Sequence, residues 1–167
     1  MLTIALLAFL SMPAVAAEAA VAGVPNFHQV NEHIYRSGQP AAGSWAVLAG
    51  MGVSTVIDLR HPGGRSKKEA QEVEAAGMYY INVPLSALSA PHDAPIAKLL
   101  AILDAEPGGA VLVHCERGAD RAGTVIACYR IAHDHWSNRK ALEEAVTHGM
   151  SPFEFGMRRY ILDFAPH

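Results

Sequence analysis

The residues best suited to chemistry stand close together, between His114 and Arg121. Cys115 and Arg121 are separated by five residues, and Gly118 lies midway between them. A thiolate is a good nucleophile, and helix N-termini and nearby cations favour it over the thiol. A guanidinium is a planar donor that matches phosphate oxygens. The spacing therefore predicts attack by Cys115 on phosphorus, with Arg121 holding the equatorial oxygens.

The segments on either side predict the elements that position this loop. Residues 110–113 read Ala-Val-Leu-Val, an apolar run typical of a buried strand, and residues 124–131 continue as a helix. A strand, a tight loop and a helix N-terminus together form an anion site from backbone N–H groups. We expect the whole loop to bind phosphate, through Cys115, Glu116, Arg117, Gly118, Ala119, Asp120 and Arg121. This chemistry requires no metal and no cofactor.

The His-Cys-x5-Arg pattern between a strand and a helix resembles the cysteine-dependent protein tyrosine phosphatase superfamily. Residues 34–40 (IYRSGQP) and 56–60 (VIDLR) also resemble segments of its bacterial dual-specificity-type members, in the same order. The resemblance runs from about Phe27 to the C-terminus. It implies a phosphoric monoester hydrolase that works through a phosphocysteine on Cys115. The substrate that the resemblance implies is a protein phosphorylated on tyrosine or on serine and threonine, or a small phosphate ester.

The mechanism that the resemblance implies needs a carboxylic acid, which protonates the leaving oxygen and later accepts a proton from water. Asp93, in a proline-rich loop upstream of the cysteine, is one candidate, and Asp120 inside the loop is the alternative. Each also has a structural interpretation. Asp93 directly precedes a periodic apolar segment and would cap a helix there, whereas Asp120 would orient Arg121.

The chain departs from the family at residue 122. The resemblance implies a serine or threonine directly after the loop arginine, with its hydroxyl hydrogen-bonded to the cysteine sulfur. This chain has Ala122, and Thr124 two residues later is not expected to replace the missing hydroxyl. We expect a less stabilised thiolate and therefore a phosphocysteine that breaks down slowly.

Two other kinds of function use similar features. Rhodanese-like sulfur transfer and arsenate-reductase-like redox chemistry also use a cysteine loop, although a rhodanese loop is usually one residue shorter and would carry a persulfide. A non-catalytic phosphate-binding module is the other alternative, and Ala122 favours it. The acidic Glu116 and Asp120 argue against polyphosphoinositides, which family members usually meet with several loop lysines or arginines.

The bulk composition predicts one small enzyme domain, which we expect to be a monomer. A chain of 167 residues is long enough for a single hydrophobic core. The net charge is −3 at pH 7 and no basic run occurs, which argues against a nucleic-acid partner. His133 and His135 form no His-x3-His pair, so a metal site is not expected. Cys128 falls at helical spacing with Thr124 and Ile131 and is expected in the core.

Residues 1–16 form a separate, almost wholly apolar segment. Ala14-Val15-Ala16 fits a small-x-small cleavage site, which predicts a secretory signal peptide followed by one domain over residues 17–167. A membrane span needs about 20 residues, so we expect no stable membrane insertion of the mature chain. Export predicts a periplasmic or secreted protein. No Lys or Arg precedes the apolar run, which a signal peptide usually has. The alternative is that the segment is an uncleaved apolar arm packed on the domain, or that the start codon is misplaced. The protein would then be cytoplasmic.

The rest of the chain alternates strands with helices. Two Ser-x-x-Glu patterns, at residues 66–69 and 151–154, are typical of capping boxes that begin helices. The alternation predicts an α/β fold with a central, largely parallel sheet of four to five strands and helices on both faces. The active loop is expected at the C-terminal end of a central strand. Asp58 and Arg60, at the end of another strand, are expected to buttress it.

Overall fold

The computed structural model describes residues 20–105 and 108–166, so the predicted signal peptide over residues 1–16 lies outside the described residues. The strands are β1 (His28–Gln29), β2 (Ile34–Ser37), β3 (Val53–Asp58), β4 (Tyr79–Asn82) and β5 (Ala110–His114). The helices are the short 3-10 turn η1 (Ala42–Ser44), then α1 (Trp45–Gly50), α2 (Gly64–Ala75), α3 (Asp93–Asp104), α4 (Asp120–Ala132), α5 (Asn138–Thr147) and α6 (Phe155–Asp163). No helix in these ranges is long and apolar enough to cross a membrane.

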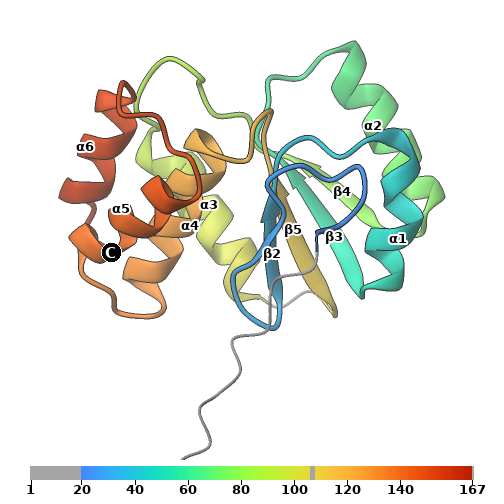
Figure 1. The fold of residues 1–167 in the computed structure, drawn as a ribbon, viewed down its shortest axis with the longest axis horizontal. Coiled ribbons are helices and arrows are strands. Elements are labelled where there is room, and N and C mark those ends of the chain that lie inside the picture. The colour runs from blue at the N-terminus through green and yellow to red at the C-terminus, as the bar shows by residue number, and fades with distance from the viewer. Residues whose placement is uncertain (1–19, 106–107, 167) are drawn as a thin grey trace, which may run out of the picture.

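The strands form one five-stranded sheet in the order β1-β2-β5-β3-β4. β2, β5, β3 and β4 run parallel, and β1 is antiparallel to β2, which confirms the predicted largely parallel sheet. His114, the last residue of β5, is in register with Ser37 of β2 and Asp58 of β3. The loop after β5 therefore leaves the sheet between the ends of two neighbouring strands, at the top of Figure 1.

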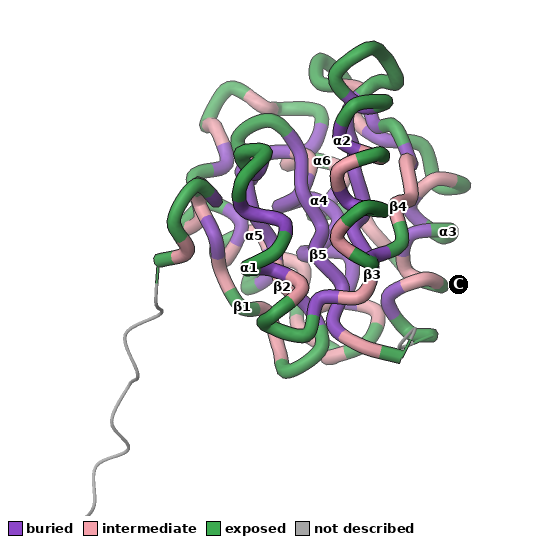
Figure 2. The backbone as a smooth tube through the Cα atoms, turned by 90° about the vertical axis from the view of Figure 1, so that its right-hand side faces the viewer, coloured by how far each residue is buried: buried purple, intermediate pink, exposed green. Residues whose placement is uncertain are grey.

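Both faces of the sheet are covered by helices, as the alternating sequence predicts. Val111 and Val113 of β5 pack into the core under α3 and α4, whereas Leu112 packs on the opposite face with residues of α1 and α2. In Figure 1, α1 and α2 lie on one side of the sheet and α3 to α6 on the other. Figure 2 shows β5 and α4 buried along most of their length. The loop between them is thus held by the most buried strand and helix of the molecule.

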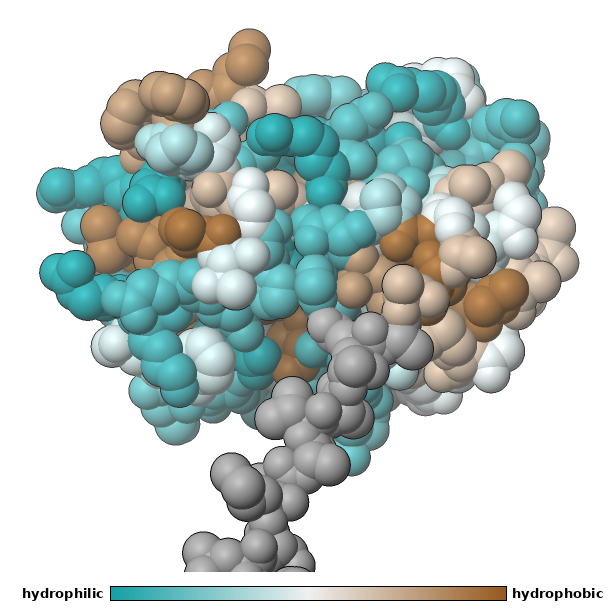
Figure 3. All heavy atoms as spheres, in the orientation of Figure 1, coloured by the Kyte–Doolittle hydropathy of each residue, from teal (hydrophilic) through white to brown (hydrophobic). Residues whose placement is uncertain are grey.

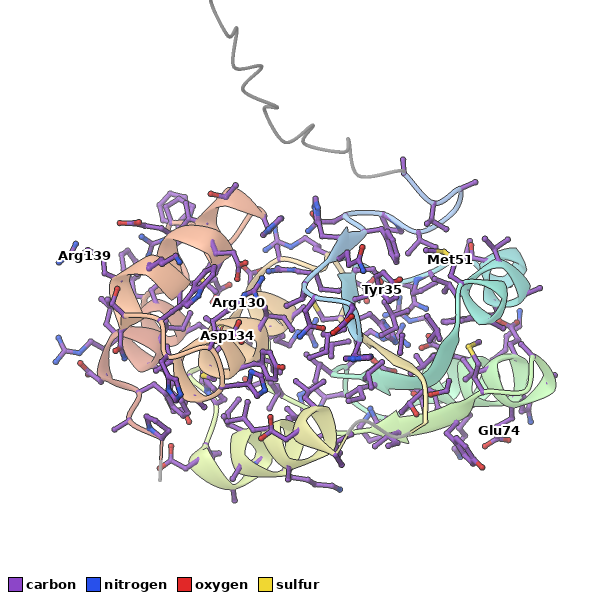
Figure 4. The ribbon with its side chains drawn as sticks, turned by 90° about the horizontal axis from the view of Figure 1, so that it is seen from below. Tyr35, Met51, Glu74, Arg130, Asp134 and Arg139 are labelled. Carbon is purple, nitrogen blue, oxygen red and sulfur yellow. The ribbon has the colours of Figure 1, made fainter. Side chains whose placement is uncertain are left out.

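Arg130 of α4 links this helix to α5. Its guanidinium binds Asp134 at 2.7 Å and Glu144 of α5 at 2.8 Å. Figure 4 shows Arg130 and Asp134 next to each other. Ser137 caps α5 by accepting a hydrogen bond from the Lys140 amide. The helix that carries the active loop therefore rests on a second, ion-paired helix.

The first of the two predicted capping boxes is wrong. α2 begins at Gly64, two residues before the serine of the pattern. The Ser66 hydroxyl donates to the carbonyl of His61 at 3.1 Å instead of capping the helix. Glu69 is only 3% exposed and points into the protein. Its carboxylate belongs to the site described below, not to a helix end.

The second predicted capping box is also wrong. Residues 151–153 form a turn, Glu154 is the N-cap residue of α6, and the helix proper begins at Phe155. The Ser151 hydroxyl accepts from the Phe153 amide at 3.2 Å. The Glu154 side chain makes no capping hydrogen bond. Its carboxylate is therefore available for another role.

Candidate active site

The loop of residues 115–119 joins β5 to α4. Cys115 is its first residue and is 2% exposed, and Ala119 is the N-cap residue of α4. The loop amides and the first turn of α4 stand at the positive end of a 13-residue helix. An anion placed beside Cys115 would meet this helix end.

Three donors outside the loop hold three consecutive loop carbonyls. They are the Gln39 amide on Glu116 O at 3.1 Å, Asn26 Nδ2 on Arg117 O at 3.2 Å, and Arg36 Nη2 on Gly118 O at 2.7 Å. A trans peptide is planar, so its N–H points away from its C=O, and the chain has no cis peptide among the described residues. The amides of Arg117, Gly118 and Ala119 therefore turn away from these donors and toward the inside of the loop. This is the arrangement that the predicted backbone anion site requires.

Gly118 is required at its position. Its φ is +72°, a backbone conformation that residues with side chains rarely adopt. A Cβ atom there would lie 2.5 Å from the carbonyl carbon of Ser37. The loop can therefore pass this close to β2 only because residue 118 has no side chain.

Arg36 was not predicted from the sequence as a site residue. It lies on β2, is 1% exposed, and also approaches the carbonyl of Ala119 at 3.4 Å. A buried guanidinium beneath the loop both fixes its carbonyls and adds positive charge under an anion site. The signal in the sequence is an arginine inside a strand, next to Ile34 and Tyr35.

A cavity of about 220 Å³ opens at Cys115. Its lining residues are Ala87, Cys115, Glu116, Arg117, Asp120, Arg121, Glu154 and Met157. The structure thus brings together Cys115, Arg121 and Asp120 from the predicted set. Arg121 Nη1 lies 3.5 Å from the carbonyl of Leu59, at the end of β3.

A second cavity, of about 500 Å³, shares Glu116 and Arg121 with the first. It extends over the start of α2, past Arg65 and His61. Arg65 forms an ion pair with Glu116 at 3.2 Å. The space beyond the cysteine pocket is therefore polar on this side.

Exposed apolar side chains neighbour two residues of the cysteine pocket in the sequence. Leu88 follows Ala87 of the cavity wall, and Phe153 and Phe155 flank Glu154 of the same wall. These three side chains are 95%, 79% and 72% exposed, respectively. Figure 3 shows apolar atoms gathered at the upper left, over the β4–α3 loop and the turn before α6. We call Leu88, Phe153 and Phe155 the apolar rim.

The structure places Asp120 in the loop pocket but gives it different partners from those expected. Its carboxylate pairs with Arg117 and accepts a hydrogen bond from the Ser151 amide at 2.9 Å. The alternative interpretation, in which Asp120 orients Arg121, is not what the hydrogen bonds show. Asp120 instead fastens the turn before α6 to the active loop.

Asp93 lies outside the cysteine pocket. It is the first residue of α3, so His92 and not Asp93 occupies the N-cap position that the sequence predicted for Asp93, and the His92 side chain makes no capping hydrogen bond. Asp93 accepts a hydrogen bond through Oδ1 from the Tyr160 hydroxyl at 2.8 Å. It lines a different cavity, of about 810 Å³, between α3 and α6. The structure therefore brings Asp93 to Tyr160 and not to Cys115.

Behind the loop lies a buried ion-pair network. Arg60 binds Asp58 through Nε and Nη2, both at 2.8 Å, and also binds Glu69 at 2.5 Å. Burial alone would raise the pKa of Asp58, but the Arg60 hydrogen bonds and the charge of His114 outweigh it and hold that pKa below its ordinary value. The predicted buttress of Asp58 and Arg60 is thus present, with Glu69 as a third member that the sequence did not reveal.

The network reaches the cysteine through His114. Nε2 of His114 lies 2.7 Å from Oε1 of Glu69, and Nδ1 lies 3.4 Å from the carbonyl oxygen of Cys115. The side chains of His114 and Glu69 are both buried. His114 therefore links the ion-pair network to the backbone of the nucleophile.

Asp58, Glu69 and His114 also have the residue types of a metal site, with ligand atoms within 4.8 Å of one another. The Arg60 guanidinium already binds both carboxylates, with Tyr80 donating to Asp58 at 2.7 Å. The geometry therefore favours an ion-pair network at this place over a metal centre.

After Arg121 the chain has Ala122 where the family resemblance implies a hydroxyl, and Thr124 does not replace that hydroxyl. Ala122 is fully buried in the same core cluster as Cys115. The Thr124 hydroxyl donates to the Asp120 carbonyl at 2.8 Å and so serves the helix backbone. Cys128 is fully buried, and burial raises the pKa of its thiol. Its place in the core is as predicted.

The family model described as "DSP-PTPase phosphatase fused to NAD+ Kinase" matches residues 15–158. The chain therefore belongs to this family of the cysteine-dependent protein tyrosine phosphatase superfamily. The family confirms the resemblance seen in the His-Cys-x5-Arg segment.

Among its relatives is the dual specificity protein phosphatase TpbA of Pseudomonas aeruginosa, 32% identical over 140 residues, which are 80% of this chain and 58% of the relative. Another is the inositol diphosphatase DSP2 of Oryza sativa subsp. japonica, 31% identical over 119 residues, 68% of this chain and 58% of the relative. The chain thus spans 58% of the length of each of these curated relatives.

Solved structures agree on the fold. The crystal structure of P. aeruginosa TpbA superposes with a TM-score of 0.75 at 28% identity and covers 92% of each chain. A TpbA variant in complex with phosphotyrosine superposes with a TM-score of 0.74 at 27% identity, covering 91% of this chain and 92% of that one. The catalytic domain of the Saccharomyces cerevisiae phosphatase Siw14, at 21% identity and a TM-score of 0.75 over 87% of this chain and 89% of that one, shares the fold.

Proposed function

We propose that this protein hydrolyses phosphate monoesters through a covalent phosphocysteine on Cys115. The observation that carries the proposal is the loop after β5. Its amides at residues 117–119 turn inward, Cys115 opens it, and Arg121 follows it on α4. Family membership supports the same reaction.

In the first step the Cys115 thiolate attacks phosphorus in line with the leaving oxygen. The equatorial oxygens are held by the loop amides and by the Arg121 guanidinium, which projects into the same cavity. Donors fixed in advance stabilise charge well, because they need not reorganise during the reaction. The outward hydrogen bonds from Gln39, Asn26 and Arg36 provide this fixation.

We propose phosphotyrosine in a protein as the preferred substrate class. The apolar rim of Leu88, Phe153 and Phe155 suits an aryl group and the chain around it. The name of the TpbA relative and its complex with phosphotyrosine support this choice. The carboxylates of Glu116 and Asp120 at the mouth oppose highly phosphorylated ligands. Phosphoserine, phosphothreonine and small phosphate esters are the classes to compare.

Hydrolysis of p-nitrophenyl phosphate tests the reaction. We expect turnover that vanadate inhibits and that Cys115→Ser abolishes. Sulfur transfer from thiosulfate to cyanide without phosphatase activity would instead indicate a rhodanese-like enzyme. Tight binding of phosphopeptides without turnover would indicate a non-catalytic module. A panel of phosphopeptides, inositol phosphates and nucleotides then ranks the substrate classes.

We further propose that the protein is exported and acts as a monomer in the periplasm or outside the cell. The apolar segment of residues 1–16 and its small-x-small sequence support export. N-terminal sequencing of the protein from a periplasmic extract should begin at Ala17. Light scattering on the same material should give the mass of one chain, and a start at Met1 in the cytoplasm would contradict export.

A further inference from the structure

The proposed function leaves the proton donor unassigned, and the inference below rests on that function. When the bond between phosphorus and the leaving oxygen breaks, that oxygen needs a proton. When water later attacks the phosphocysteine, its proton needs an acceptor. A carboxyl group within reach of both steps must therefore lie in the pocket that contains Cys115.

Three carboxylates line that pocket, and two of them are already bound. Glu116 pairs with Arg65 at 3.2 Å. Asp120 pairs with Arg117 and accepts from the Ser151 amide. Glu154 is the third, and no ion pair or side-chain hydrogen bond joins it to any residue in the described ranges.

The backbone holds Glu154 firmly at the pocket. The turn that contains it is fastened to the active loop by the hydrogen bond from the Ser151 amide to Asp120, at 2.9 Å. Met157, three residues later on α6, is 2% exposed and lines the same cavity. Glu154 and Met157 thus line the pocket together, one at the N-cap of α6 and one on its first turn.

The family resemblance places the acid on a loop upstream of the cysteine, but that loop brings no carboxyl group to this pocket. The loop between β4 and α3 reaches the pocket through Ala87, which cannot transfer a proton. This loop packs against the start of α6, because a Cβ on Gly156 would lie 3.0 Å from the Ala90 amide nitrogen. Asp93, farther along, is bound to Tyr160 in a different cavity. Glu154, the N-cap residue of α6, therefore replaces the loop as the source of a carboxyl group.

We propose that Glu154 is the general acid and then the general base of the reaction. As Cys115 sulfur bonds to phosphorus, the bond to the leaving oxygen breaks and that oxygen takes the Glu154 proton. Water then attacks phosphorus and gives a proton to the Glu154 carboxylate, the bond between sulfur and phosphorus breaks, and phosphate leaves. Glu154 and the thiolate return to their first states. The charged and titratable groups facing Glu154 across the pocket are Cys115, Glu116, Arg117, Asp120 and Arg121.

The leaving group provides the test, because an acid matters most when the leaving oxygen is strongly basic. We expect Glu154→Gln to lower kcat for phenyl phosphate by about 100-fold or more. The loss for p-nitrophenyl phosphate, whose leaving group is a good one, should be much smaller. The variant should also lose the alkaline limb of the pH–rate profile with phenyl phosphate, and Glu154→Asp should keep part of it.

Three parallel variants make the result decisive. Glu143→Gln, on α5 and away from the pocket, should match the wild type with both substrates. A leaving-group-dependent loss in Asp93→Asn or Asp120→Asn, with Glu154→Gln unaffected, would overturn the assignment. Equal losses of Glu154→Gln on both substrates, in a protein of unchanged melting temperature, would overturn it as well. If the wild type hydrolyses neither substrate, the proposed phosphatase function fails instead.

Discussion

Nε2 of His114 lies 2.7 Å from Oε1 of Glu69, and both side chains are buried. This contact connects α2 to the residue that precedes the nucleophile. Arg60 lies on the other oxygen of Glu69 and continues to Asp58. One line of buried polar contacts thus runs from the end of β3 to the residue before the active loop.

Glu69→Gln should lower kcat/KM by on the order of tenfold, because the carboxylate that contacts His114 and pairs with Arg60 is lost while the shape of the side chain is kept. Steady-state kinetics well below the melting temperature measures the effect. Glu74→Gln is the matched control: Glu74 lies on the same helix but is exposed at the periphery of the molecule (Figure 4). A folded Glu69→Gln protein with unchanged kcat/KM would disprove the positioning role.

Gly118→Ala should destabilise the fold by about 1–3 kcal/mol and abolish phosphate binding. The reason is the positive φ of residue 118 together with its contact with Ser37. Thermal unfolding and titration with vanadate measure the two effects. Gly43→Ala is the control, since a Cβ there meets no atom within 4 Å. A variant that binds vanadate as the wild type does would contradict the described loop geometry.

Ala122→Ser should raise turnover and reduce the initial burst of product. Residue 122 is buried in the same core cluster as Cys115, and the family resemblance implies that a hydroxyl at this position bonds to the sulfur and stabilises it as a leaving group. Rapid-quench kinetics measures both quantities. Thr124→Val should leave them unchanged, because the Thr124 hydroxyl serves the Asp120 carbonyl. A strictly linear onset in the wild type would count against slow breakdown of the phosphocysteine.

The lowered pKa of Asp58 predicts that the stability of the fold depends on pH. Its pKa is lowered in the folded protein, so its contribution to stability is present above the ordinary pKa of about 4 and is lost as the pH falls through the folded-state pKa. Asp58→Asn should therefore lower the free energy of unfolding at pH 7 and flatten its decline below about pH 4. Urea unfolding over a pH series tests this, with the exposed Asp104→Asn as control. An unchanged acid decline in Asp58→Asn would refute it.

The sequence was sufficient for the fold and for the active loop, because both depend on local patterns. Alternating apolar segments predict the parallel sheet, and the spacing of Cys115 and Arg121 predicts the anion site. The sequence was misleading at two glutamates, Glu69 and Glu154. Each lies three residues after a serine, and this spacing resembles a capping box. In the structure Glu69 completes the buried network and Glu154 lines the pocket.

The reason for these errors is that a capping pattern describes one helix end, whereas both glutamates act across the fold. Glu69 reaches His114 on β5, and Glu154 faces the loop that precedes α4. Arg36 was missed for the same reason, since its partners lie 82 and 83 residues away. Contacts of this length follow from the arrangement of elements and leave no mark in a short window of sequence.

The side chain of Asn26 connects three distant parts of the chain. Its amide donates to the carbonyl of Arg117, 91 residues away, and to that of His148, 122 residues away. The anion site is therefore complete only when the N-terminal segment, the active loop and the end of α5 have all docked. Phosphate or vanadate should consequently act as a chemical chaperone for the whole domain, and affinity for the anion becomes a measure of how completely the chain has folded.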